Sequence, residues 1–97
     1  MAFSMTGTTA SLRVGGRPAL TLDRFTFATR DPSMGGGWRV DGHVAARDDY
    51  WLERATEYDL RLALTRSSWR WRNVPAAAVS ISGEDVTITH MGEPDDA

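Results

Sequence analysis

The chain contains no cysteine, no lysine and no glutamine. Without cysteine the protein cannot form a disulfide or a thiolate metal site. No apolar run approaches the length of about 18 residues that a membrane-spanning helix needs. The first nine residues lack the basic and apolar regions of a signal peptide. We therefore expect a protein that is kept in the cytoplasm or assembled from it, with no membrane partner.

All eleven basic residues are arginine. We attribute this to codon usage in a GC-rich genome, because arginines occur along the whole chain rather than in one segment. The alternative is that guanidinium groups were selected for bidentate contacts at an interface. The formal net charge of −2 argues against nucleic acid as a specific ligand, since nucleic-acid-binding domains are usually basic.

The chain of 97 residues has the size of one domain. Residues 1–8 are small and polar with two isolated hydrophobic residues, which predicts a flexible N-terminal arm. Residues 93–97 form a short acidic C-terminal tail. Residues 9–92 are then a single β domain.

Apolar residues between these ends alternate with polar ones, as in strands with one buried face. Asp48 or Asp49 can cap one short helix over about residues 49–56, with Glu53 and Glu57 on its exposed side. The pattern predicts a mainly β fold, either a small β-sandwich or a partly closed barrel, with about seven strands and this one helix.

The first hairpin turns at Gly15-Gly16. A three-residue loop over residues 15–17 would place Leu12 opposite Leu20, and Ala10 opposite Leu22, so that the apolar residues share one face. The alternation then breaks at Asp23-Arg24. A β-bulge there would return Phe25 and Phe27 to the leucine face, and the alternative is a strand that crosses from one sheet to another.

Two further hairpins are expected near the C-terminal end. Leu64 is predicted to pair with Trp69, and Leu62 with Trp71. In the last hairpin, Gly83-Glu84 suits a type II′ turn. Its strands pair Val79 with Ile88 and Ile81 with Val86.

We find no arrangement of residues that is typical of catalysis or metal binding. His43 and His90 have no second ligand at metal-binding spacing, and we expect both to be surface or edge residues. The neighbouring carboxylates at 48–49 and at 53 and 57 suit helix capping and a solvated helix face. The sequence therefore predicts a protein that is not an enzyme and has no catalytic residue, metal or cofactor.

The run Trp69-Arg70-Trp71-Arg72 most resembles a binding motif. Because successive side chains of a strand point to opposite faces, the tryptophans would join the core, while Arg70 and Arg72 would cluster with Arg61 near Asp59. Like charges on one sheet face repel unless something neutralises them. The partner could be an acidic surface of a neighbouring subunit, the acidic tail or a phosphate. In the alternative interpretation, the tryptophans stack on single-stranded nucleic acid.

The loop Asp31–Gly37 carries Gly35, Gly36 and Gly37. No lysine follows these glycines, and they do not lie between a strand and a helix, which disfavours a phosphate-binding loop. We expect a mobile loop tip and a second candidate for intermolecular contact.

The order of these features resembles small bacteriophage virion proteins, chiefly the tail-tube type. The matching pieces are the Gly15-Gly16 hairpin, the Asp31–Gly37 loop, the helix after Arg47 and the closing Val79–Ile88 hairpin. The resemblance spans most of the chain and is one of architecture, without a specific motif. It implies a β-sandwich with one helix in mid-chain, a mobile loop that joins neighbouring subunits, assembly into rings and no catalytic residues.

Two functional hypotheses follow. The first is a structural subunit of a phage-like particle, at the tail tube, elsewhere in the tail, or in head completion or capsid decoration. It would be located in the virion, and its partners would be further copies of itself and neighbouring virion proteins. The alternative is a small β-barrel that binds a small molecule or single-stranded nucleic acid near Trp69, Arg70 and Trp71.

Overall fold

The computed structural model describes residues 4–7, 9–30, 33, 36–64 and 67–90. The fold is mainly β, as predicted, and this part of the chain contains eight strands, seven of which form the main order of the sheet. The elements in chain order are β1 (Ser4–Gly7), β2 (Thr9–Val14), β3 (Arg17–Thr29), β4 (Trp38–Arg47), α1 (Asp49–Arg54), β5 (Glu57–Ala63), β6 (Ser68–Pro75), the 3-10 turn η2 (Ala76–Ala78), β7 (Val79–Ser82) and β8 (Asp85–His90).

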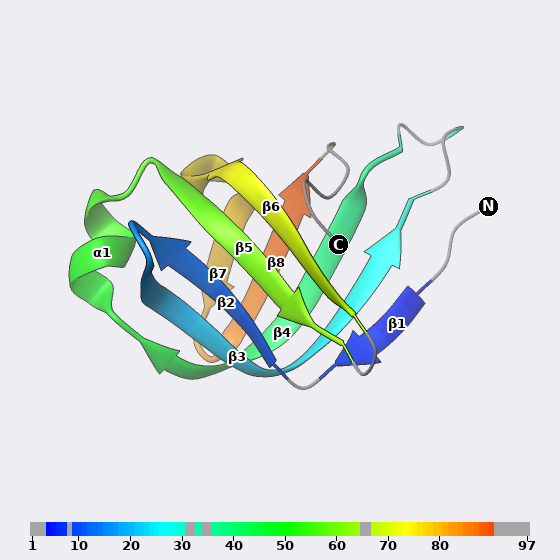
Figure 1. Ribbon diagram of the computed structural model, residues 1–97, viewed down its shortest axis with the longest axis horizontal. Coiled ribbons are helices and arrows are strands. Elements are labelled where there is room, and N and C mark those ends of the chain that lie inside the picture. Colours follow the sequence, from blue (N-terminus) through cyan, green and yellow to red (C-terminus); the bar gives the residue numbers. More distant parts are fainter. Residues whose placement is uncertain (1–3, 8, 31–32, 34–35, 65–66, 91–97) are drawn as a thin grey trace.

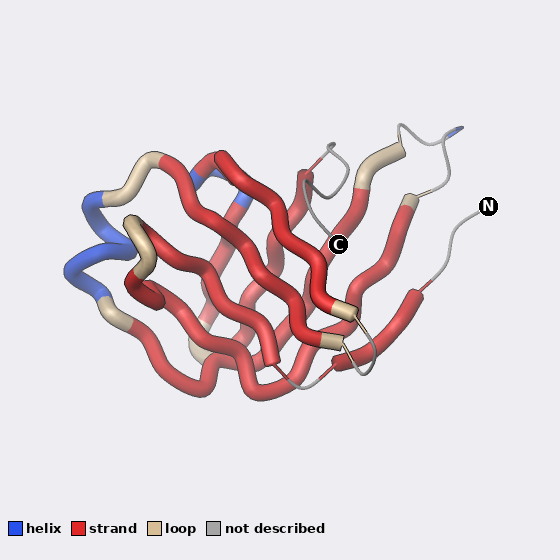
Figure 2. The backbone as a smooth tube through the Cα atoms, viewed as in Figure 1, coloured by secondary structure: helices blue, strands red, loops and turns tan. Residues whose placement is uncertain are grey.

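The strands form one antiparallel sheet in the order β6-β5-β2-β3-β4-β8-β7, and β1 pairs with β3 beside this path. The sheet curls into a half-barrel (Figure 1), so the partly closed barrel was the correct alternative to the sandwich. The two edge strands, β6 and β7, are consecutive in the sequence and are joined by η2. Figure 2 shows strands over most of the described chain, with helical turns only at the connections.

Part of the expected N-terminal arm is a strand. Ser4–Gly7 form β1, which pairs with β3 in the register Met5 to Phe27 and Gly7 to Phe25. Met5 is partly buried against the core, and this burial explains why a methionine stands at this position in an otherwise polar segment. Residues 1–3 and 8, and the predicted acidic tail 93–97, lie outside the described residues.

The first hairpin has the predicted face but a different turn. Leu12 pairs with Leu20 and Ala10 with Leu22, as expected. The three-residue loop is wrong, because Val14 pairs with Arg17 and leaves the two-residue turn Gly15-Gly16. Both glycines have positive φ, +58° and +85°, as a type I′ turn requires. A bulge at Ala19 supplies the extra residue that keeps the leucines on the core side.

The predicted bulge near Asp23 is confirmed. Leu22 pairs with Val44 and Arg24 with His43, so Asp23 is the extra residue. Leu20 and Leu22 before it, and Phe25 and Phe27 after it, are all buried. The bulge thus restores the alternation within one sheet, and the strand does not cross to a second sheet.

The third hairpin differs from the prediction by two residues. Leu62 pairs with Trp69, and Leu60 with Trp71, in place of the expected Leu64–Trp69 and Leu62–Trp71 pairs. The turn is tighter than expected, since the backbone N–H of Leu64 donates to the Ser67 carbonyl at 2.8 Å. A shift of two residues leaves every side chain on its predicted face.

The last hairpin has the predicted register, with Val79 opposite Ile88 and Ile81 opposite Val86. Gly83 has φ +61° while Glu84 is not in the positive-φ region, which fits the expected type II′ turn.

The helix is capped by Asp48, whose carboxylate accepts a hydrogen bond from the Tyr50 backbone N–H at 3.1 Å. It ends at Arg54, two residues earlier than predicted, and Glu57 belongs to β5. Trp51 and Leu52 pack partly buried against the core. The short helix therefore covers one end of the half-barrel (Figure 1).

Aromatic rings fill the centre of the curled sheet. The ring centroids of Trp38 and Trp71 are 4.7 Å apart, and Phe27 lies 5.5 Å from Trp71 and 5.2 Å from Trp69. Sixteen hydrophobic residues of the described ranges are buried, and most come from alternate positions on β2 to β6 and on β8. The core is thus supplied by one face of one sheet rather than by two facing sheets.

Gly42 on β4 makes room for a core side chain. A Cβ at this position would lie 2.5 Å from Cδ1 of Leu22 and 3.1 Å from the carbonyl oxygen of Arg24. Leu22 is buried, and the Arg24 carbonyl belongs to the bulged part of β3, so neither neighbour can move freely.

We expect Gly42→Ala to lower the free energy of unfolding by about 1–3 kcal/mol, because it overpacks the core. Urea denaturation followed by tryptophan fluorescence measures the change. Ser80→Ala on the exposed side of β7 is the control and should alter stability by less than about 0.5 kcal/mol. Equal stability of Gly42→Ala and the wild type would contradict the close approach.

Tyr58 joins β5 to the helix. Its hydroxyl donates to the Leu52 carbonyl at 3.1 Å, and the side chain is buried. Burial raises the pKa of Tyr58 above its ordinary value of 10.0, because desolvation disfavours the phenolate. The neutral phenol is therefore favoured by folding, and this contribution is present below pH ~10 and is lost as the pH rises through the folded-state pKa.

Tyr58→Phe should cost about 0.5–1.5 kcal/mol at neutral pH through the lost hydrogen bond. The variant should also lose less stability than the wild type between neutral pH and about pH 11. Urea unfolding at the two pH values tests both points. Tyr50→Phe is the control, because Tyr50 is 54% exposed, and it should have the same stability as the wild type at both pH values. If Tyr58→Phe and the wild type lost the same stability at alkaline pH, the raised pKa of Tyr58 would be refuted.

Candidate functional site

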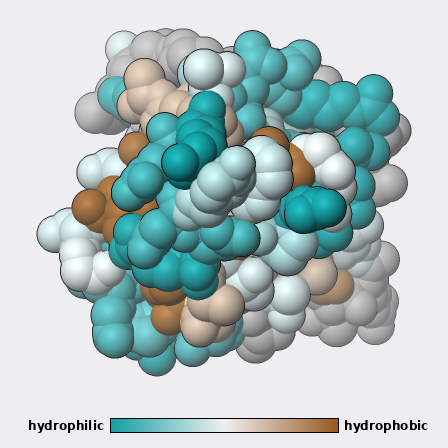
Figure 3. All heavy atoms as spheres, turned by 90° about the vertical axis from the view of Figure 1, so that its left-hand side faces the viewer, coloured by the Kyte–Doolittle hydropathy of each residue, from teal (hydrophilic) through white to brown (hydrophobic). Residues whose placement is uncertain are grey.

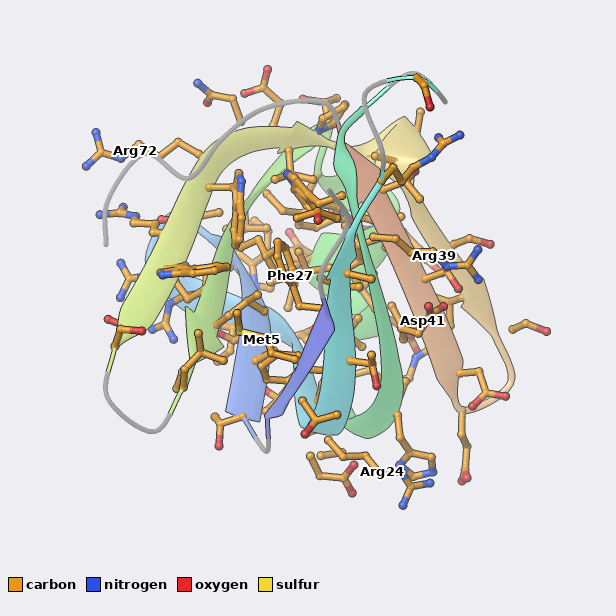
Figure 4. The ribbon with its side chains drawn as sticks, turned by 90° about the vertical axis from the view of Figure 1, so that its right-hand side faces the viewer. Met5, Arg24, Phe27, Arg39, Asp41 and Arg72 are labelled. Carbon is orange, nitrogen blue, oxygen red and sulfur yellow. The ribbon has the colours of Figure 1, made fainter. Side chains whose placement is uncertain are left out.

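The outer face of β2, β5 and β6 carries arginines from all three strands. Arg61 pairs directly with Arg70 across β5 and β6. Arg13 pairs with Asp59 across β2 and β5. Arg72 follows two positions after Arg70 on β6 and points away from the barrel in Figure 4, whereas Phe27 lies inside it. We call Arg13, Arg61, Arg70, Arg72 and Asp59 together the arginine surface.

Asp59 is the centre of this surface. Its two carboxylate oxygens accept hydrogen bonds from Nε and Nη2 of Arg70, the shortest of them 2.6 Å. Nη2 of Arg61 lies 3.8 Å from the same carboxylate. The side chains of Asp59 and Arg70 are only 22% and 32% exposed, so this pair is shielded from solvent more than the other arginine–aspartate pairs of the described residues. A bidentate contact of this kind fixes the guanidinium plane.

Arg13 was not anticipated from the sequence. Its Nη2 donates to the Gly16 carbonyl at 2.8 Å, and its Nε is buried without a hydrogen-bond partner among the described residues. The pairing of β2 with β5 is what places Arg13 opposite Asp59. These strands are far apart in the sequence, and no local pattern identifies them as neighbours.

A bulge on β6 shapes the surface next to Arg72. Tyr58 pairs with Val74 and Leu60 with Trp71, so Arg72 and Asn73 together oppose Asp59. Asn73 has φ +58° and is the one non-glycine residue with positive φ among those described. Asparagine tolerates this conformation better than most residues. The bulge bends β6 and re-aims the side chains around Asp59.

A groove of about 280 Å³ runs along this bulge. Three arginines and two carboxylates line it together with uncharged residues of β2, β5 and β6: Arg13, Arg70, Arg72, Glu57, Asp59, Val14, Gly15, Tyr58 and Asn73. The end of the molecule that carries α1 and the β2–β3 turn is largely hydrophilic, with small apolar areas (Figure 3). The groove is thus a polar site suited to a partner with carboxylate or phosphate oxygens.

The predicted division of the Trp-Arg run is confirmed. Trp71 is buried, and Trp69 is partly buried with its ring edge-on to Phe27 and Trp71. Arg70 and Arg72 lie on the opposite face of β6 from these rings. The tryptophans are therefore core residues, and the face of the Trp71 ring is not available to stack on a base.

The described glycines of the loop, Gly36 and Gly37, are not on the strands that carry the arginine surface. Gly35 falls outside the described residues, while Gly36 and Gly37 have φ of +68° and +87°. The Arg30 backbone N–H donates to the Gly37 carbonyl at 2.9 Å at the base of the loop. The loop joins β3 to β4, whereas the arginines stand on β2, β5 and β6. The two sets of candidate residues are therefore separate.

His43 occupies a second, acidic region. Its Nδ1 lies 3.2 Å from Asp23 and its Nε2 lies 3.1 Å from Glu84. A groove of about 430 Å³ beside it is lined by Asp41, Asp85 and Arg24 among others. In the part of the chain that is described, no three histidine, cysteine, aspartate or glutamate residues are placed to hold a metal ion. His43 links the β3 bulge to the β7–β8 turn.

None of the helices within the described ranges is long and apolar enough to cross a membrane.

We expect Asp59→Asn to lower the free energy of unfolding by about 1–2 kcal/mol, because a neutral amide replaces the carboxylate that binds Arg70 bidentately in a partly buried position. Asp41→Asn is a matched control. Asp41 also accepts two hydrogen bonds from one arginine, Arg39, but that pair is 54% and 49% exposed and should contribute less than about 0.5 kcal/mol. Urea unfolding at low salt measures both, and equal losses would show that Asp59 has no special role.

Comparison with known proteins found no matching family model, no matching curated protein and no matching solved structure.

Proposed function

We propose that this protein is a non-enzymatic structural subunit of a phage-like particle, in or associated with the tail tube, and that it acts by self-assembly. Its partners are then further copies of the chain and neighbouring virion proteins, and its location is the virion. The observation that carries the proposal is the arginine surface.

Among the described residues, the arginine surface and its groove hold more arginines than carboxylates. Four arginines stand around Asp59, and Glu57 is the one other carboxylate that lines the groove. Neighbouring like charges on a sheet face are unfavourable unless a partner neutralises them. Among the described residues, exposed carboxylates such as Glu84 and Asp85 stand on the β7–β8 hairpin, on other strands than the arginines. A second copy therefore offers a complementary surface.

The open sheet supports the same proposal. Within the described residues, β6 pairs only with β5 and β7 only with β8, so each has one unpaired edge. Unpaired strand edges are common sites of association between chains. The short helix in mid-chain and the hairpins at the two ends are in the order expected from the resemblance to virion proteins, although the sheet is a half-barrel and not the β-sandwich that the resemblance implies.

The alternative function is that of a small binding module. The polar groove beside Arg72 and Asn73 favours a small anionic molecule over a stacked base, because the Trp71 ring is buried. A small anion would stabilise a monomer without changing its mass. The two functions are therefore separated by the oligomeric state.

Native mass spectrometry of the full chain over a range of concentrations tests the proposal. We expect a series of multimers at near-physiological salt, with a smaller multimeric fraction at high salt because exposed charges are screened. Light scattering on the same samples gives an independent mass. A strictly monomeric protein at high concentration under both conditions would overturn the proposed function.

A further inference from the structure

The turn between β7 and β8 carries the exposed negative charge of the acidic region. Glu84 lies in the two-residue turn, and Asp85 follows as the first residue of β8. Asp23 approaches from the β3 bulge through its contact with His43. The side chains of Glu84 and Asp23 are 80% and 50% exposed. We call Glu84, Asp85 and Asp23 the acidic turn.

The backbone and the histidine hold the acidic turn in a fixed position. The Val44 backbone N–H donates to the Glu84 carbonyl at 2.8 Å, and Nε2 of His43 lies 3.1 Å from the Glu84 carboxylate. The positive φ of Gly83 gives the tight turn that projects these carboxylates. A group that is already ordered loses little conformational entropy when it binds.

We propose that the arginine surface of one copy binds the acidic turn of a second copy. This inference rests on the proposed function and names the contact through which the copies assemble. Guanidinium groups of Arg61 and Arg72 would take up carboxylates of Glu84 and Asp85 beside the Arg70–Asp59 pair. Arginine is suited to this contact because its planar donors match a carboxylate.

The two surfaces lie on different strands of the sheet. The arginine surface lies on β2, β5 and β6, and the acidic turn joins β7 and β8, at the other end of the strand order. Different patches of the two copies therefore meet. If the contact is head-to-tail, it closes into rings or extends into filaments, and if two copies exchange it about a two-fold axis, they form a dimer. The masses of the assemblies distinguish these arrangements.

Charge reversal on each side, followed by charge exchange, tests the contact. Arg72→Glu and Glu84→Arg should each raise the concentration needed for half-assembly by about tenfold or more, because each places like charges in contact. The double variant that carries both changes should assemble nearly as the wild type does. An equimolar mixture of the two single variants should also recover assembly. Native mass spectrometry and light scattering give the readout.

Arg24→Glu is the matched control. Arg24 is exposed beside the acidic region, so the same change of charge should leave assembly unchanged or strengthen it. Near-UV circular dichroism checks that each variant is folded. If Arg72→Glu does not fold, Arg61→Glu takes its place in the experiment. The Arg61 side chain is 48% exposed.

Three other results would overturn the proposed contact between the arginine surface and the acidic turn, and a fourth would reassign the arginine surface. Wild-type assembly that persists in both single variants would overturn the contact while leaving the proposed function intact. Loss of assembly in both single variants without recovery in the double variant would also overturn it. A monomeric wild type would overturn both proposals. Binding of a 15-nucleotide oligo-dT probe that Arg72→Glu abolishes, without an effect on assembly, would assign the surface to nucleic acid instead.

Discussion

The structure depends on one constraint: a single sheet must direct all its apolar side chains to one side while it curls. In a strand with strict alternation, every second side chain stays on the same face of the sheet even though the strand twists. Here extra residues at Ala19 and Asp23, and the Arg72-Asn73 pair opposite Asp59, reset the phase and bend the strands. The aromatic core and the curved outer face are both consequences of these bulges.

The outer face acquires its charge from the same alternation. Wherever β5 and β6 place a leucine or tryptophan inside, the next residue faces outwards, and several of these residues are arginine. Asp59 organises them, because its carboxylate binds Arg70 bidentately at a site that solvent reaches poorly. Charge that is fixed in place on a curved surface favours a specific partner over a general attraction to anions.

The half-barrel also places the arginine surface and the acidic turn on different strands. The arginine surface stands on the strands near one edge of the sheet, and the acidic turn belongs to the hairpin at the other edge. The curl presents them as two distinct patches on one small molecule. Assembly through such patches needs no deep cavity and no catalytic group, which is consistent with the structural role proposed for the chain.

The sequence by itself determined the strand faces, the bulge near Asp23, a helix cap at Asp48 or Asp49 and the last hairpin, because each depends on neighbouring residues and on periods of two. The tertiary structure alone decided the register of Trp69, which a tight turn sets, and the strand formed by Ser4–Gly7, which a distant partner stabilises. It also decided that Arg13 joins Arg61, Arg70 and Arg72, because β2 lies beside β5. Contacts between strands far apart in the sequence leave no local pattern from which they could be predicted.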